Sequence, residues 1–143
     1  MSLNFRAKFL FIVSIAFAIY SILWALAPFA EINLPARFIL DLADWPVDSL
    51  SVPLDKNTMW LSAIGAGLLG GYSVFLGGIV VPAIKEKNRS IIRTAILAMV
   101  FWYLLDSVGS YAAGVASNVF FNTVYLALVL IPLMGIKEDT KLN

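Results

Sequence analysis

The stretch that decides the fold is TAILAMVFWYLLDSVGSYAAGVAS, residues 94–117. It holds 24 residues between Arg93 and Asn118, and its only charged side chain is Asp106. A helix of about 20 mainly apolar residues is long enough to cross the ~30 Å hydrocarbon core of a bilayer. An acid near the centre of such a helix costs about 2.5–3.5 kcal/mol on insertion scales and normally faces other helices or a wet cavity. The stretch therefore predicts a transmembrane helix with one polar site at its middle.

The composition of the rest of the chain agrees with a membrane protein. Hydrophobic residues make up 61% of the 143 residues and charged residues only 13%, with a mean hydropathy of +0.89. Soluble domains carry about 25% charged residues. The apolar runs predict an all-α, polytopic membrane protein, a four-helix up-down bundle in which residues 1–143 form one domain. The predicted spans cover residues 9–29, 58–83, 94–117 and 119–136.

One long connection, residues 31–57, separates the first two spans. Within it Phe38, Leu42 and Trp45 recur at i, i+4 and i+7, which is the spacing of one helix face. The segment is too short to span. It predicts a short amphipathic helix over residues 34–45 that lies in the external membrane interface with its apolar face down.

The 58–83 span is rich in glycine, with six in one helix. Two rows of small residues recur at four-residue spacing, Ala63-Gly67-Gly71 and Ala66-Gly70. Small residues let the backbones of neighbouring membrane helices approach closely. The pattern predicts a central helix that packs through its glycines, with the 94–117 span, which carries Gly109, against it.

Lysine and arginine predict the orientation, because cytoplasmic loops carry an excess of both. Ten such residues divide eight to two between the sides. The chain is thus expected to be a multi-pass protein of the inner (cytoplasmic) membrane with both termini in the cytoplasm. The eight are Arg6, Lys8, Lys85, Lys87, Arg89, Arg93, Lys137 and Lys141, and the two on the other side are Arg37 and Lys56.

Asp106 is the best chemical candidate in the chain. No predicted span contains lysine, arginine or histidine, so loss of hydration favours the neutral carboxyl form. Alignment of the spans by depth places hydroxyl groups from three helices at the level of this acid. The predicted ligand or proton site consists of Asp106, Tyr20, Tyr72, Ser73, Trp102, Tyr103 and Ser110.

Two interpretations of this site stay open. In the first, Asp106 loads and releases a proton or binds a cation, as membrane acids do in carriers. In the second, it is a structural hydrogen-bonding group that ties helices together for about 0.6 kcal/mol per interaction.

Several classes of chemistry are excluded by composition. The chain has no cysteine and no histidine, so it cannot form disulfides, thiolate nucleophiles or a Ser-His-Asp triad. Nothing indicates an enzyme or a cofactor. The acids Asp41, Asp44 and Asp48 match no calcium loop, so no metal site is expected. A net charge of +1 gives no field for nucleic acid.

The short basic turn after the second span has two readings. Topology alone explains it, and it also suits anionic lipid head groups. The residues concerned are Lys85, Lys87, Arg89 and Arg93.

The layout resembles the DoxX-like group of small four-span bacterial membrane proteins. The resemblance rests on Ala27-Pro28-Phe29 at the end of the first span, the amphipathic loop segment, and the glycine-rich run Ile64–Gly71. It implies the four-span fold but transfers no activity and no functional residues.

The sequence predicts a non-enzymatic membrane protein that contacts the lipid bilayer and either other membrane subunits or itself. As an accessory subunit it would act within a larger complex. The alternatives are a proton- or cation-linked carrier of small molecules that uses Asp106, and a bundle that binds a lipid, quinone or pigment.

Overall fold

The computed structural model describes residues 1–47 and 50–136, and every regular element in them is helical. Four helices are long and apolar enough to cross a membrane, which confirms the all-α class and the number of long apolar helices. Asp48, Lys137 and Lys141 lie outside the described residues. The elements are α1 (Leu3–Trp24), α2 (Leu34–Ala43), α3 (Lys56–Phe75), the π-helical turn η1 (Leu76–Val80), α4 (Val81–Lys85), α5 (Arg89–Ala112) and α6 (Ala116–Leu133).

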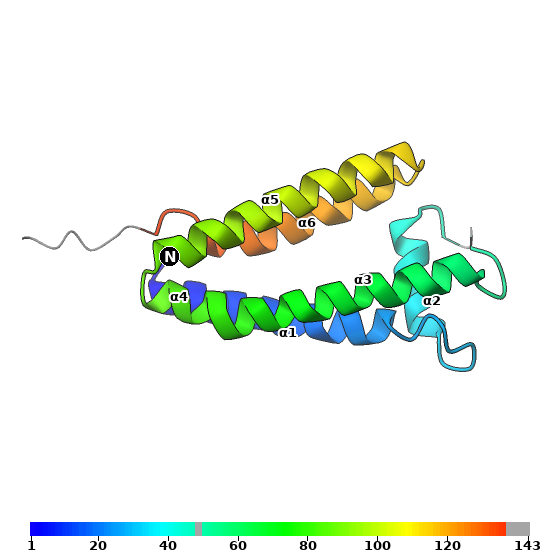
Figure 1. Ribbon diagram of the computed structural model, residues 1–143, viewed down its shortest axis with the longest axis horizontal. Coiled ribbons are helices and arrows are strands. Elements are labelled where there is room, and N and C mark those ends of the chain that lie inside the picture. The colour runs from blue at the N-terminus through cyan, green and yellow to red at the C-terminus, as the bar shows by residue number, and fades with distance from the viewer. Residues whose placement is uncertain (48–49, 137–143) are drawn as a thin grey trace, which may run out of the picture.

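The long helices form two pairs, α1 with α3 and α5 with α6 (Figure 1). The two pairs meet at the end where α4 lies and diverge toward the other end, where α2 lies. The start of α1 and the end of α6 both lie at the α4 end. We call the α4 end the closed end and the α2 end the open end.

The expected packing of the third span against the glycine-rich helix is wrong. Elements α3, η1 and α4 together form the second long helix, Lys56–Lys85. Helix α5 packs mainly against α6, and it meets the second long helix chiefly at η1 and α4. The central element is α1, which contacts α2, α3, η1, α4 and α6. The reason is chemical, because the small residues of α3 fit α1, whereas the polar side chains of α5 find their partners on α6.

The boundaries of α5 differ from the predicted 94–117 span by five residues at each end. The helix begins at Arg89 because the Asn88 side chain accepts a hydrogen bond from the backbone N–H of Ile91 at 3.3 Å. It ends at Ala112, two residues before Gly114, whose φ of 86° terminates it. Asp106 therefore lies about 9 Å from the end of the helix and not at its middle.

The other predicted spans also shift. Helix α1 starts at Leu3 behind a Ser2 cap and ends at Trp24, short of the predicted residue 29, and α2 ends two residues early. Helix α6 covers residues 116–133, not 119–136. Pro82 does not interrupt the second long helix, since α4 follows η1 directly and continues to Lys85. Proline is tolerated there since it stands in the first turn of α4, where a missing N–H costs little.

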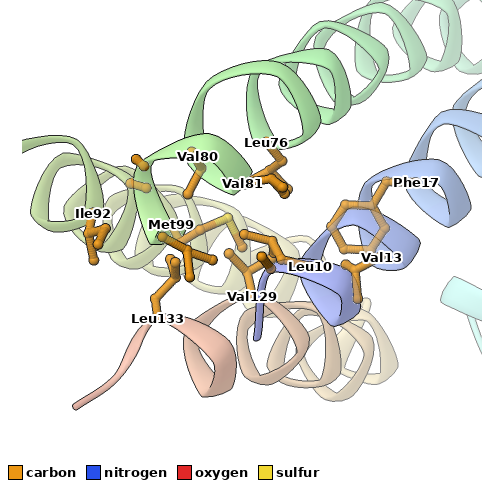
Figure 2. Packing of buried hydrophobic residues seen from close by; sticks show 14 residues of the cluster. Leu10, Val13, Phe17, Leu76, Val80, Val81, Ile92, Met99, Val129 and Leu133 are labelled. Carbon is orange, nitrogen blue, oxygen red and sulfur yellow. The ribbon is translucent and has the colours of Figure 1, made fainter. Parts of the chain in front are cut away.

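An apolar core joins the two pairs at the closed end. Leu10 of α1, Leu76 and Val80 of η1, and Val129 and Leu133 of α6 are at most 1% exposed. Figure 2 shows these side chains converging, together with Met99 and Ile92 of α5. The Arg6 guanidinium adds a polar tie at this end by donating to the carbonyls of Pro132, at 3.0 Å, and Met134.

Candidate functional site

Asp106 is held by three hydrogen bonds at the α5–α6 contact. Its Oδ1 accepts from Ser110 Oγ at 3.0 Å, from Asn118 Nδ2 at 3.0 Å and from Asn122 Nδ2 at 2.9 Å. One donor comes from α5 and two come from α6. The acid thus links the two helices of one pair.

Sequence spacing explains this geometry. Asp106 and Ser110 are four residues apart on α5, and Asn118 and Asn122 are four apart on α6, so each couple lies on one helix face. The short turn at residues 113–115 makes the helices antiparallel and brings the two faces together. Further bonds run from Asn118 Nδ2 to Ser110 Oγ at 2.8 Å and from Asn122 Nδ2 to Ser107 Oγ at 3.4 Å.

Tyr103 and Thr123 extend the cluster by one turn, with their hydroxyl oxygens 3.2 Å apart. We refer to the whole cluster as the polar seam. It comprises Tyr103, Asp106, Ser107, Ser110, Asn118, Asn122 and Thr123.

The two oxygens of Asp106 have different surroundings. All three donors meet Oδ1, whereas Oδ2 accepts no hydrogen bond from the described residues. Oδ2 is not among the sealed, unpartnered polar atoms, and the side chain is half-buried. Asn122 is only 2% exposed, so the donor side of the acid is sealed while Oδ2 stays accessible.

Of the predicted site residues, Ser110 binds Asp106 and Tyr103 joins the polar seam, but the other four lie elsewhere. Ser73 Oγ donates to the carbonyl of Gly70 at 2.7 Å. The Tyr20 ring packs edge-on against Tyr125, with centroids 5.9 Å apart. The Tyr72 ring packs against Phe75, and its buried hydroxyl has no hydrogen-bond partner in the described part of the chain. Trp102 packs against the apolar core.

The sequence reasoning missed Asn118 and Asn122. Asn118 fell in the connection between the predicted spans 94–117 and 119–136. The centre of the 119–136 span is apolar in sequence, so no polar partner for Asp106 was expected from it. The available signal was the equal four-residue spacing of the two asparagines and of Asp106 with Ser110 on either side of a short turn.

One glycine row of α3 packs closely against α1. A Cβ placed on Gly70 would lie 2.9 Å from Ser21 Oγ, and one on Gly77 of η1 would lie 2.9 Å from Ser14 Oγ. A Cβ on Gly65 would lie 2.4 Å from the Trp24 ring. The Ser14 and Ser21 hydroxyls donate back to the carbonyls of Phe11 and Ala18, which leaves the contact free of unpaired donors.

The other predicted packing glycines have no such neighbour. A Cβ on Gly67, Gly71 or Gly109 would meet no other atom within 4 Å, and the same holds for Gly78 of η1, which was not predicted to pack. The literal GxxxG motif, Gly67 and Gly71, therefore lies on an exposed face of α3.

The basic turn lies at the closed end, on the connection between α4 and α5. Lys85 is in the last turn of α4, Lys87 has a φ of 54°, and Arg89 and Arg93 occupy the start of α5. In the described residues no group of three or more His, Cys, Asp or Glu side chains could hold a metal ion.

Comparisons of the chain with protein-family models, with curated proteins and with solved structures give no match. The resemblance to the DoxX-like group stays a prediction from layout.

Proposed function

We propose that this chain is a small, non-enzymatic, four-span protein of the inner membrane that works as a scaffold or accessory subunit. It would dock other transmembrane helices on the exposed small-residue face of α3. That face consists of Ala63, Gly67 and Gly71 of α3 and continues to Gly78 of η1.

The observation that carries this proposal is the unequal use of the two glycine rows of α3. The row with Gly70 packs against α1, since a Cβ on Gly70 would lie 2.9 Å from Ser21 Oγ. The row with Gly67 and Gly71 meets nothing within 4 Å. Between lipid-facing helices, small residues allow the close backbone approach that drives association. A free row of this kind suits a partner helix, from another subunit or from a second copy.

The proposed orientation places the closed end in the cytoplasm. Arg6, Lys85 and Arg93 belong to elements at that end, in keeping with the excess of positive charge in cytoplasmic loops. At the open end, α2 exposes Leu34 by 76% and Phe38 by 63%, which suits an external interfacial helix. The chain has no native cysteine, so single introduced cysteines can map each loop with an impermeant thiol reagent.

The test is purification from native membranes in mild detergent, with the double variant Gly67→Ile/Gly71→Ile beside the wild type. We expect the wild type to elute with a partner or as an oligomer and the variant to elute alone. The matched control is Leu68→Ile, because Leu68 is 72% exposed on the same helix and adds no bulk when replaced. A wild type that elutes as a lone monomer, or a variant that keeps its partner, contradicts the proposal.

A further inference from the structure

We propose that Asp106 Oδ2 is a binding site for a monovalent cation, either a proton or a sodium-like ion. This inference goes beyond the scaffold role and concerns the α5–α6 pair alone. It concerns binding and makes no claim of transport.

The two carboxylate oxygens of Asp106 differ in their hydrogen bonding. A carboxylate offers about four acceptor positions over its two oxygens. Ser110, Asn118 and Asn122 all donate to Oδ1, which fixes the carboxyl plane and leaves Oδ2 without a donor from the described residues. A group that occupies Oδ2 therefore displaces none of these hydrogen bonds.

The charge of the Asp106 carboxylate is not balanced by a bonded cation from the described residues. A half-buried carboxylate attracts a positive charge more strongly than an exposed one, because the protein screens charge less than water does. Helix α6 carries no Lys, Arg or His, and on α5 the cations Arg89 and Arg93 lie more than three turns before Asp106. The structure gives Asp106 no ion pair with any described residue. Among the described residues no positively charged group bonds to Asp106, so a bound cation can supply the balancing charge.

The other titratable groups on the helices around Asp106 lie on α5, α6 and α2. On α5 these are Tyr103, which bonds Thr123, and Tyr111, which is 74% exposed. On α6 the titratable group is Tyr125, whose ring meets Tyr20 and Phe17. Helix α2 contacts this end of α6 and carries Asp41 and Arg37, with Asp44 at its C-cap. The Arg37 guanidinium donates to the carbonyl of Ser51 at 3.1 Å and makes no bond to Asp106.

The composition of the site favours a monovalent cation. A single carboxylate with neutral amide and hydroxyl neighbours provides one negative charge, which balances one positive charge. Divalent ions prefer several carboxylates, and none gather here in the described residues. A proton needs only Oδ2. A sodium-like ion would also use neutral oxygens, such as the amide oxygens of Asn118 and Asn122 or Ser107 Oγ.

Infrared spectroscopy of the purified full chain in lipid nanodiscs tests the site, because a protonated carboxyl group has its own C=O band. The Asp106→Asn spectrum is subtracted from the wild type while pH is varied in choline chloride. We expect a band that grows as pH falls, that Asp106→Asn lacks and that the matched control Asp41→Asn keeps. If the cation is sodium-like, replacing choline by sodium at fixed pH shrinks this band, whereas a proton-only site ignores sodium.

Two results would overturn the proposal. One is a carboxyl band from Asp106 that is constant over the whole pH range and insensitive to sodium, because it would mean a permanently neutral acid. The other is no Asp106 band at any pH together with no effect of sodium on the ionised carboxylate bands. Should Asp106→Asn fail to fold, Asp106→Glu serves instead, since it shifts the band in place of removing it.

Discussion

The two helix pairs are built on opposite principles. Helices α1 and α3 meet through shape, with serine hydroxyls and the Trp24 ring seated on glycines. Helices α5 and α6 meet through polar chemistry, with one carboxylate oxygen gathering three donors. The first pair should be sensitive to atoms added at the glycines that face α1, and the second to the loss of polar groups around Asp106. This difference predicts which substitutions each pair should tolerate.

The two pairs are also joined differently at their two ends. At the closed end an apolar core and the Arg6 guanidinium bind them together. At the open end α2 meets α6 through Ser117, whose hydroxyl donates to the Ala43 carbonyl and accepts from the Trp45 N–H at 3.1 Å. These hydrogen bonds join α2 to α6, whereas a small apolar cluster of Ala27, Ala36 and Leu54 packs α2 against the ends of α1 and α3.

The largest expected effect on stability is the difference between replacing Gly65 and replacing Gly67, both in α3. Gly65→Ala should destabilise the protein by about 1–3 kcal/mol, because the new Cβ collides with a rigid ring. Gly67→Ala has open space and should leave stability unchanged or raise it by about 0.5–1 kcal/mol through helix propensity. The measurement is the unfolding free energy of both variants in detergent micelles by steric trapping. Equal effects of the two replacements would mean that the α1–α3 contact does not depend on shape.

Asn122→Leu tests the polar pair. The replacement removes a donor to Asp106 and to Ser107 from a site that is 2% exposed. Hydrogen bonds between membrane helices contribute on average about 0.6 and at most about 1.7 kcal/mol, so a loss within that range is expected. Thr123→Val, on the same helix but at the edge of the polar seam, should cost less. An Asn122→Leu variant more stable than the wild type would show that apolar packing could replace the polar seam.

Ser117→Ala tests the tie at the open end. The loss of two hydrogen bonds at a partly exposed site should cost about 0.5 kcal/mol and act locally. We expect faster amide exchange over α2 with no change over α1 and α3. Ser90→Ala, at the closed end, is the matched control. Unchanged exchange in α2 would mean that contacts other than Ser117 hold this helix.

The smallest effect concerns the start of α3 and depends on pH. Asp55 caps this helix by accepting from the Thr58 hydroxyl and from the backbone N–H groups of Thr58 and Asn57. These bonds, with the Thr58 hydroxyl first, hold the pKa of Asp55 below its usual value of 3.8. The cap therefore stabilises the helix fully above that value and is lost as pH falls through the lower pKa of the folded state. Amide protection in the first turn of α3, measured relative to the intrinsic exchange rate at each pH, should fall below about pH 4 in the wild type. Asp55→Ala should show low protection there at every pH.

The four long helices could be predicted from the sequence, because about 20 apolar residues leave a chain few other options in a bilayer. The close contact of Gly70 with Ser21 was also predictable in kind, since small residues recur on both helices. The partner of Asp106 was not. Depth alignment pointed to Tyr20, Tyr72 and Ser73, but it rested on helix boundaries that the Asn88 cap and Gly114 shift by five residues. A one-turn error in depth is enough to exchange one set of polar neighbours for another.

The choice between the two glycine rows was likewise beyond the sequence. Both glycine rows of α3 look equally suited to packing, and only the three-dimensional arrangement tells which one is used. The short turn at residues 113–115 fixed α5 beside α6, but it did not say that α5 would turn its polar face to α6 and not to α3.

The most direct test of the central claim, that Asp106 belongs to the α5–α6 contact, is a pair of double-mutant cycles. One combines Asp106→Ala with Asn122→Ala, and the other combines Asp106→Ala with Tyr72→Phe. We predict a coupling free energy of about 0.6–1.7 kcal/mol for the first cycle and a value near zero for the second. Coupling to Tyr72 with none to Asn122 would contradict the account, because it would return the acid to the glycine-rich helix.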